Sequence, residues 1–189
     1  MLVGEKVILE DIDVDNLEKM RQWRNDPQLR QFFRCYKDIS VNMQMDWFKE
    51  RGNNSDSHHV YFQIMSKCST EEDSTMLKRY FIGCCNLSYI DYRLRSAEFG
   101  IYIDPKEHGR GKGYDALKLM FSFGFDELNL HKIWCEVFDN NYSIGLYRKL
   151  GFKDEGILRD NYFHNGKYGN SIMMSILEDE WRTIHPRSK

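Results

Sequence analysis

The middle of the chain carries three glycines that alternate with two basic residues, in the run GRGKG at 109–113. Apolar residues alternate just before this run, at 99–103, which predicts a strand, and Pro105 ends that strand because proline lacks a backbone N–H. Apolar residues recur at helical spacing after Gly113, which predicts a helix. A glycine-rich turn before a helix N-terminus binds anions through free N–H groups and the helix dipole. This segment therefore predicts a phosphate site.

Two familiar phosphate motifs do not fit this loop. A Walker loop needs Gly-Lys followed by Ser or Thr, whereas Lys112 is followed by Gly113 and Tyr114. The dinucleotide fingerprint GxGxxG fails because these glycines recur every second residue. For the loop alone, a solvated turn between strand and helix is the alternative interpretation.

A second segment of chemical interest is NNYSIGLYRKLGF at 140–152. Ile144, Tyr147 and Leu150 share one helical face, so one interpretation of Tyr147 is a core residue. A buried tyrosine usually finds a partner for its hydroxyl, which leaves room for a catalytic role.

Together the two segments resemble the GNAT superfamily of acetyl-CoA-dependent N-acetyltransferases, and the resemblance extends from Val3 to about Trp181. The family's cofactor signature, Gln/Arg-x-x-Gly-x-Gly/Ala, aligns without gaps with HGRGKG at 108–113. Its second signature, an asparagine followed by a short helix that ends Leu-Tyr-x-x-x-Gly-Phe, matches 140–152.

The resemblance implies how the chain holds acetyl-CoA. Backbone amides of 109–114 would hold the pyrophosphate, and the strand edge at 101–103 would pair with the pantetheine amides like an added strand. Asn140 would bind the pantetheine arm and Tyr147 would face the thioester sulfur. The expected cofactor contacts are Ile101, Tyr102, Ile103, His108, Gly109, Arg110, Gly111, Lys112, Gly113, Tyr114, Asn140 and Tyr147.

One position departs from the family pattern, since His108 stands where Gln or Arg is usual. A histidine can donate a hydrogen bond to a phosphate, but a neutral imidazole brings no charge. Arg110 or Lys112 is then expected to supply the charge.

The chemistry requires a neutral amine, so a base or a proton wire to water is useful near neutral pH. A glutamate at the position of Glu98 often serves as base in similar proteins, and a structural carboxylate is the alternative. The resemblance implies direct attack in a ternary complex, with the oxyanion held by a backbone N–H near Ile101 or Tyr102. Tyr147 would protonate the thiolate. Asp115 is expected to face outward, because its charge would repel a phosphate.

The first two expected helices and the residues that follow them are expected to face the acceptor amine. This region is rich in basic residues: Arg21, Arg24, Arg30, Arg34 and Lys37. A polyamine site needs carboxylates, so these residues favour an acceptor that carries phosphate, and we expect an aminated nucleotide sugar. The segment 23–27 with Arg30 resembles acetyltransferases of that kind. The candidate acceptor contacts are Trp23, Arg24, Phe33, Tyr162 and Tyr168.

Three alternatives stay open for the function. The segments 95–99, 130–133 and 165–168 resemble spermidine N-acetyltransferases and the ribosomal-protein N-acetyltransferase branch, so a polyamine or a protein N-terminus is the second choice. A domain that binds CoA as a sensor or interaction module is the non-enzyme alternative.

Composition sets the class of protein. The 189 residues suit one domain, 1–189, with a polar tail that frays after about 182. A net charge of −2 argues against a nucleic-acid partner, and no apolar run approaches the ~20 residues of a membrane span. Five cysteines without a CxxC pair argue against a disulfide framework and a metal site, so we expect a cytoplasmic enzyme without a metal. The oligomeric state is open, and a homodimer through the terminal strands is typical of such folds.

The patterns and the resemblance predict a mixed α/β fold of the GNAT type, with a twisted mixed β-sheet of about seven strands flanked by helices. The expected strands are 3–9, 60–64, 80–89, 98–103, 133–137, a strand from 152 onward, and 172–177. The expected helices are 13–23, 29–33, 43–51, a helix after 113, and 141–150, and a polar hairpin turn is expected at 66–78.

Overall fold

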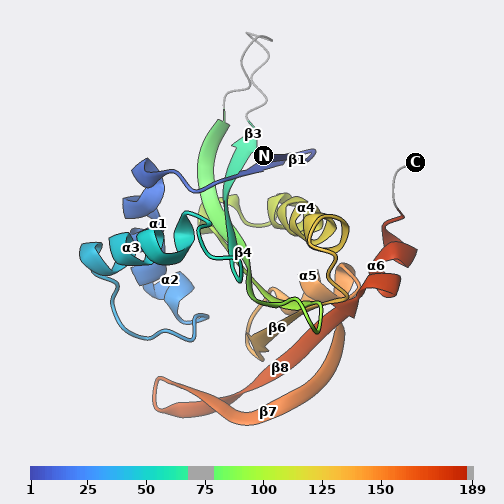
Figure 1. Cartoon of the computed structure of the whole chain (residues 1–189). Helices are drawn as coiled ribbons and strands as arrows, with labels where there is room; N and C mark the ends of the chain where they lie inside the picture. The colour runs from blue at the N-terminus through green and yellow to red at the C-terminus, as the bar shows by residue number, and fades with distance from the viewer. Residues whose placement is uncertain (68–78, 187–189) are drawn as a thin grey trace.

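A computed structural model describes residues 1–67 and 79–186, and it shows an eight-stranded sheet with helices on both faces (Figure 1). The strands follow the order β1-β2-β3-β4-β5-β6-β8-β7. All neighbours are antiparallel except β5 and β6, which are parallel. The mixed α/β fold is as predicted, with one strand more because the expected strand at 3–9 is divided into β1 and β2.

The strands are β1 (Leu2–Val3), β2 (Val7–Glu10), β3 (Val60–Lys67), β4 (Arg79–Asp91), β5 (Ser96–Ile103), β6 (Lys132–Phe138), β7 (Lys153–His164) and β8 (Lys167–Leu177). The helices are α1 (Leu17–Asn25), α2 (Pro27–Arg30), α3 (Val41–Trp47), α4 (Lys112–Asp126), α5 (Ile144–Lys149) and α6 (Glu178–Ile184). Single turns are η1 (Val14–Asn16), η2 (Phe48–Gly52) and η3 (Pro105–Glu107).

The helices form two layers, with α1, α2 and α3 on one side of the sheet and α4 on the other (Figure 1). The main core lies between the sheet and α4, where Leu117 and Phe121 are fully buried. A smaller apolar cluster joins α1 to β4 through Met20 and Cys84. Val14, which the helical pattern placed inward, is 49% exposed because it belongs to the single turn before α1.

Asp115 ties the start of the chain to α4, and the expectation that it faces outward is wrong. Its carboxylate is buried and accepts the backbone N–H groups of Lys6 at 2.7 Å and Val7 at 3.0 Å. The backbone N of Glu5 lies 3.3 Å from its other oxygen. These donors compensate the buried charge, and they turn the carboxylate away from the glycine loop.

The functional cleft begins where β5 and β6 separate. Their parallel pairing covers only 96–98 with 132–134. Beyond that point β5 stays paired with β4 as far as Ile103, and β6 stays paired with β8 as far as Phe138. Beyond the paired residues, the facing edges of β5 (99–103) and β6 (135–138) are therefore no longer hydrogen-bonded to each other and diverge. We call the gap between them the V.

The C-terminal part differs from the prediction in two ways. β7 and β8 run almost to their turn at Asn165 and Gly166, which both have positive φ, so the predicted separation at 162–167 is too long. Helix α6 continues past 182, where fraying was expected, because Trp181 is fully buried against Phe125. The predicted hairpin turn at 66–78 lies largely outside the described residues. No helix in the described part of the chain is long and apolar enough to cross a membrane.

Candidate active site

A cavity of about 860 Å³ fills the V between β5 and β6. Its wall includes β5 from Glu98 to Ile103, β6 from Cys135 to Phe138, the glycine loop, the start of α5, and the segment after α2. This volume suits a small-molecule site. The cavity brings together the two segments whose chemistry the sequence singled out.

The glycine loop presents a helix N-terminus to the cavity. Gly109 and Gly111 have φ of +73° and +77°, a left-handed conformation that strains residues with a Cβ. Gly111 precedes the 15-residue helix α4, and no side chain caps that helix. The first N–H groups of α4 are therefore available to an anion, and the helix dipole favours one there.

Several charges surround this loop. Lys112 Nζ lies 2.5 Å from a carboxylate oxygen of Glu107 and 3.1 Å from the Tyr80 hydroxyl. Arg110 lies 3.3 Å from the same Glu107 oxygen. Lys6 Nζ donates to the Arg110 carbonyl at 2.9 Å and adds a cation that the sequence analysis missed. Glu107 thus offsets part of the predicted positive charge, and Lys6 restores some of it.

The His108 ring is held by two neighbours. Its Nε2 lies 2.9 Å from the Ile103 carbonyl, so Nε2 carries the proton and donates. Its Nδ1 lies 3.4 Å from the Tyr142 hydroxyl. The ring therefore links the end of β5 to the turn before α5. A contact between His108 and a phosphate stays a prediction.

Tyr147 reaches the cavity from α5 and is 7% exposed. Its ring packs edge-on against Phe99 of β5, with centroids 5.0 Å apart. Burial, and after it the neighbouring Cys135, raises the pKa of Tyr147 above its usual value. The hydroxyl is therefore protonated at neutral pH and is able to give a proton.

Glu98 is buried on the cavity wall at the start of the V. Arg34 Nη2, from the segment between α2 and α3, lies 2.5 Å from Glu98 Oε1. Burial raises the pKa of the Glu98 carboxyl, Arg34 lowers it in part, and the charge of Glu136 adds to the rise. A carboxylate with a raised pKa is a better proton acceptor than an exposed one.

The β5 edge at 101–103 lines the cavity as expected. The Tyr102 side chain points away into the α1 layer, where its ring contacts Trp23 and Phe33 at 6.4 and 5.8 Å. Burial raises the pKa of its hydroxyl well above the usual value. Only the backbone of this edge is suited to pair with an extended ligand.

The candidate acceptor contacts divide into two groups. Arg24 and Phe33 line the cavity, with the guanidinium 5.2 Å from the centre of the ring. Trp23 is 5% exposed and does not line the cavity, because its ring packs on Phe81 in the α1 layer.

Tyr162 and Tyr168 also lie off the cavity wall. The Tyr162 ring stacks on Phe138 at 4.2 Å, and its hydroxyl donates to Asp139 at 3.0 Å, so it fastens the β7–β8 hairpin to β6. Tyr168 is 68% exposed on that hairpin. Of the five candidate acceptor contacts, Arg24 and Phe33 are the two that line the cavity, and their contact with the acceptor stays a prediction.

Two expected cofactor residues are displaced from the wall. Asn140 is exposed, and its neighbour Asn141 lines the cavity instead. Asn141 Oδ1 accepts the N–H of Ser143 at 2.8 Å, which turns its side chain toward α5. Arg110 points outward and is 61% exposed.

Other wall residues escaped the sequence analysis: Asn86, Ser88, Glu136, Asn141 and Lys149. The signal for Glu136 was available, because it alternates with the buried Cys135 and Val137 on β6 and so faces the opposite side. Asn86 and Ser88 pair with Gly100 and Glu98 across β4 and β5, a register that no local pattern predicts.

The cavity fits acetyl-CoA on structural grounds. The N-terminus of α4 suits the pyrophosphate, the free β5 edge suits the pantetheine amides, and the protonated Tyr147 hydroxyl belongs to the same cavity. Within the described residues, no group of three His, Cys, Asp or Glu side chains is placed to hold a metal ion.

Comparison with known proteins gives the same assignment. A family model described as an acetyltransferase (GNAT) domain matches residues 6–153. Spermidine N(1)-acetyltransferase of Escherichia coli K12 is 40% identical over 156 residues, which cover 78% of this chain and 81% of that protein. The putative ribosomal N-acetyltransferase YdaF of Bacillus subtilis is 30% identical over 100 residues, 52% of this chain and 55% of that protein.

Solved structures agree with this result. The spermidine N-acetyltransferase of Vibrio cholerae, crystallised with CoA and spermine, superposes with a TM-score of 0.78 at 26% identity, over 93% of this chain and 97% of that one. The family match over residues 6–153 includes the glycine loop, both strands of the V and α5 together, rather than one motif alone. The chain belongs to the GNAT family and is an acetyl-CoA-dependent N-acetyltransferase.

Proposed function

We propose that this enzyme acetylates a primary amine of a polyamine, with spermidine as the first candidate, by direct attack in a ternary complex. The observation that carries the proposal is the buried Glu98 carboxylate, whose pKa is raised by burial and which shares the cavity with Tyr147. A second carboxylate, Glu136, lies on the facing strand. Relatives named for spermidine and a structure with spermine support the same acceptor class.

The geometry suggests one order of proton movements. Glu98 takes a proton from the acceptor ammonium, and the freed nitrogen attacks the thioester carbon. A backbone N–H near Ile101 or Tyr102 stabilises the oxygen as negative charge develops on it. The nitrogen, now cationic, gives its second proton to water. The C–S bond then breaks, Tyr147 gives its proton to the sulfur, and the tyrosinate that is left takes a proton back from water.

The sequence-based preference for an aminated nucleotide sugar finds no support. It depended on free basic residues, but Arg21 pairs with Glu18 and Arg30 pairs with Asp38. Arg34 is bound to Glu98. Among the basic residues in question, ion pairs thus use up much of the charge that was expected to bind phosphate.

A screen of acceptors tests the proposal. Purified protein and acetyl-CoA are incubated with spermidine, spermine, aminated nucleotide sugars and peptides with free N-termini, and the free thiol of CoA is measured. We expect kcat/KM for spermidine at least about tenfold above the other classes, a difference of ~1.4 kcal/mol in transition-state binding. Acetylation of a nucleotide sugar or a peptide in preference to every polyamine would refute the acceptor class.

The cellular compartment, the partners and the oligomeric state of the enzyme are a separate part of the proposal. We place it in the cytoplasm, as a single domain that acts on a small amine without nucleic acid or membrane. The four cysteines that the structure describes are free thiols, which suits a reducing compartment. Light scattering of the purified protein decides between a monomer and the homodimer that the resemblance suggested.

A further inference from the structure

Two carboxylates from different strands face one guanidinium in the cavity. Arg34 Nη2 lies 2.5 Å from Glu98 Oε1 on β5, and Arg34 Nη1 lies 3.6 Å from Glu136 Oε2 on β6. The two strands diverge just beyond Glu98, so the carboxylates approach the guanidinium from the two arms of the V. All three side chains line the cavity.

The carboxylates are the fixed part of this group. The side chains of Glu98 and Glu136 are 7% and 13% exposed, and both stand on strands of the central sheet. Asn161 of β7 donates to Glu136 Oε1 at 2.6 Å, which leaves Oε2 to face Arg34. Glu136 is therefore oriented before any ligand arrives.

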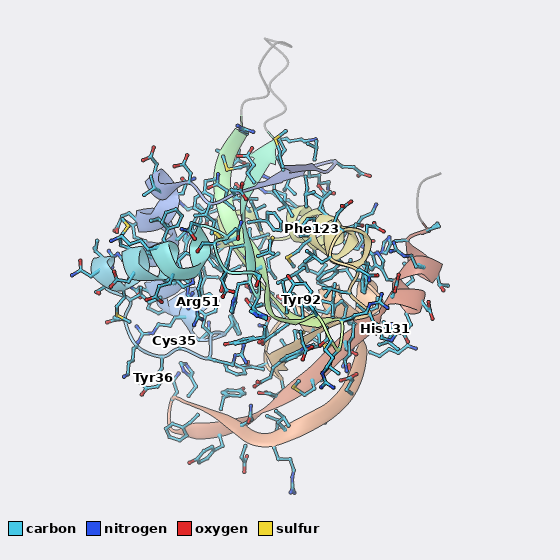
Figure 2. All side chains as sticks on the ribbon, viewed as in Figure 1. Cys35, Tyr36, Arg51, Tyr92, Phe123 and His131 are labelled. Atoms are coloured by element: carbon cyan, nitrogen blue, oxygen red, sulfur yellow. The ribbon has the colours of Figure 1, made fainter. Side chains whose placement is uncertain are left out.

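The guanidinium is the replaceable part. Arg34 is 56% exposed and lies in the segment 31–40, which joins α2 to α3 without helix or strand. Figure 2 labels its neighbours Cys35 and Tyr36 on this segment, below the layer of α1, α2 and α3. Moving an exposed side chain on a connecting segment away from its partner costs less free energy than moving a residue of a central strand.

The position of the group fits the acceptor amine. After burial, the charge of Glu98 raises the pKa of the Cys135 thiol, and Cys135 in the same way raises the pKa of Tyr147, so Cys135 lies near both the carboxylates and the tyrosine. A cation between the carboxylates therefore lies next to the place where the thioester is expected. A cation between the two buried carboxylates stabilises their ionised form, because unpaired buried charge is costly.

We propose that Glu98 and Glu136 form the binding site for a cationic amine of the acceptor, and that the Arg34 guanidinium occupies this site until the acceptor replaces it. The inference rests on the proposed function, since it requires a cationic acceptor. It makes Glu136 a residue that determines acceptor specificity and Arg34 a competitor of the acceptor.

The exchange has a chemical consequence. The guanidinium keeps its proton at any working pH, whereas an acceptor ammonium is able to give one to Glu98. The N–H bond then breaks, an O–H bond forms on Glu98, and the nitrogen lone pair becomes free to attack. Arg34 thus protects the carboxylates without starting the reaction.

Arg34→Met tests the competition, because it keeps an unbranched apolar stem and removes the charged guanidinium. With saturating acetyl-CoA we expect KM for spermidine to fall about threefold to fivefold and kcat to stay within about twofold, as for loss of a partly exposed ion pair. Glu136→Gln keeps a hydrogen bond with Asn161 and is expected to raise KM about tenfold. Arg34→Lys keeps the charge but loses the second nitrogen that faces Glu136, so its KM for spermidine is expected to lie between those of Arg34→Met and the unaltered enzyme.

Arg51→Met is the matched control, because this arginine is exposed in η2 and does not line the cavity. Calorimetric titration of each enzyme–CoA complex with spermidine measures affinity without turnover, and thermal unfolding checks that each variant folds. Arg34→Met that weakens spermidine binding would show that Arg34 binds the acceptor directly, and unchanged KM and affinity would show that it does not compete. Either result overturns the inference.

Failure of the proposed function is distinguishable from failure of this site. If the unaltered enzyme neither binds nor acetylates any polyamine, the polyamine proposal falls and the inference falls with it. If spermidine is acetylated but the Arg34 and Glu136 variants change KM in the opposite directions, only the assignment of the cation site falls.

Discussion

Asp115 Oδ2 accepts the backbone N–H of Lys6 at 2.7 Å, across 109 positions of the sequence. Asp115 lies in the first turn of α4, directly after the glycine loop, and Lys6 Nζ reaches back to the Arg110 carbonyl of that loop. One carboxylate therefore joins the N-terminal strands, the loop and α4. The structure of the glycine loop therefore depends on the N-terminal residues around Lys6, which belong to neither of the two sequence motifs.

Asp115→Ala is expected to lower the free energy of unfolding by about 2–4 kcal/mol, because it leaves backbone N–H groups of Lys6 and Val7 without an acceptor. Urea denaturation followed by circular dichroism measures the change. Glu127→Ala, at the exposed end of the same helix, is the control and is expected to change stability by less than about 0.5 kcal/mol. Equal losses in the two variants would contradict the anchoring role.

Tyr147→Phe is expected to lower kcat tenfold or more, at or just below the usual ~10²–10⁴ of general acid catalysis. Burial raises the pKa of Tyr147, so the hydroxyl holds its proton at neutral pH. Phenylalanine keeps the ring contact with Phe99, and the fold is not expected to change. Tyr92→Phe removes a hydroxyl that bonds the Ser57 carbonyl away from the cavity, and serves as control. Unchanged thiol release by Tyr147→Phe would remove Tyr147 from the mechanism.

Gly111→Ala is expected to raise KM for acetyl-CoA with little change in kcat. Gly111 has φ of +77°, a conformation that costs other residues roughly 1–2 kcal/mol. With alanine, the free loop is expected to relax, and the cofactor must then restore the strained conformation, so KM should rise about fivefold to thirtyfold. A Cβ there would also lie 2.9 Å from Lys6 Nζ. Gly145→Ala is a matched control, since a Cβ at Gly145 meets nothing within 4 Å. A kcat effect with unchanged KM would argue against a loop that binds the cofactor.

Sequence patterns predicted the two parts of the site that each form within a short segment of the chain. The glycine loop and the helix that carries Tyr147 each depend on spacing within about a dozen residues, and the cavity contains both. Their meeting across the V depends on β5 and β6 separating after Glu98, which involves residues from four strands. That the two segments meet was expected from the resemblance, not from either segment alone.

The errors have physical causes that the sequence hides. The acceptor side looked cationic because the partners of its arginines, such as Asp38 and Glu98, were not recognisable as partners. Asp115 was expected to face outward because its charge would repel a phosphate, and the backbone donors that hold it inward are more than a hundred positions away in the sequence. Asn141 rather than Asn140 lines the cavity, and its side chain accepts the N–H of Ser143, a detail that the motif does not predict.

We expect the carboxyl of Glu98 to set the acid side of the pH dependence of activity. Burial raises its pKa, Arg34 opposes the rise and Glu136 adds to it, so the acid limb of the kcat/KM profile is expected above the ~4.3 of an ordinary glutamate. The sign follows from the mechanism, because only the deprotonated carboxylate accepts a proton and activity falls as the pH drops through this pKa. Arg34→Met removes the group that lowers the pKa and is expected to move the limb to higher pH.

Glu98→Gln distinguishes the contribution of Glu98 to the pH profile from the contributions of the groups that face it: Arg34, Cys135 and Glu136. We expect it to lower kcat/KM about 10²-fold and to abolish this acid limb, since an amide takes no proton. The change in activity at high pH is expected to stay the same in this variant, because it is caused by deprotonation of the acceptor amine. Rates measured by thiol release across the pH range show both limbs. A Glu98→Gln enzyme that keeps the acid limb at the same pH would assign that limb to Glu136 or to the acceptor, and Glu98 would then be a structural partner of Arg34.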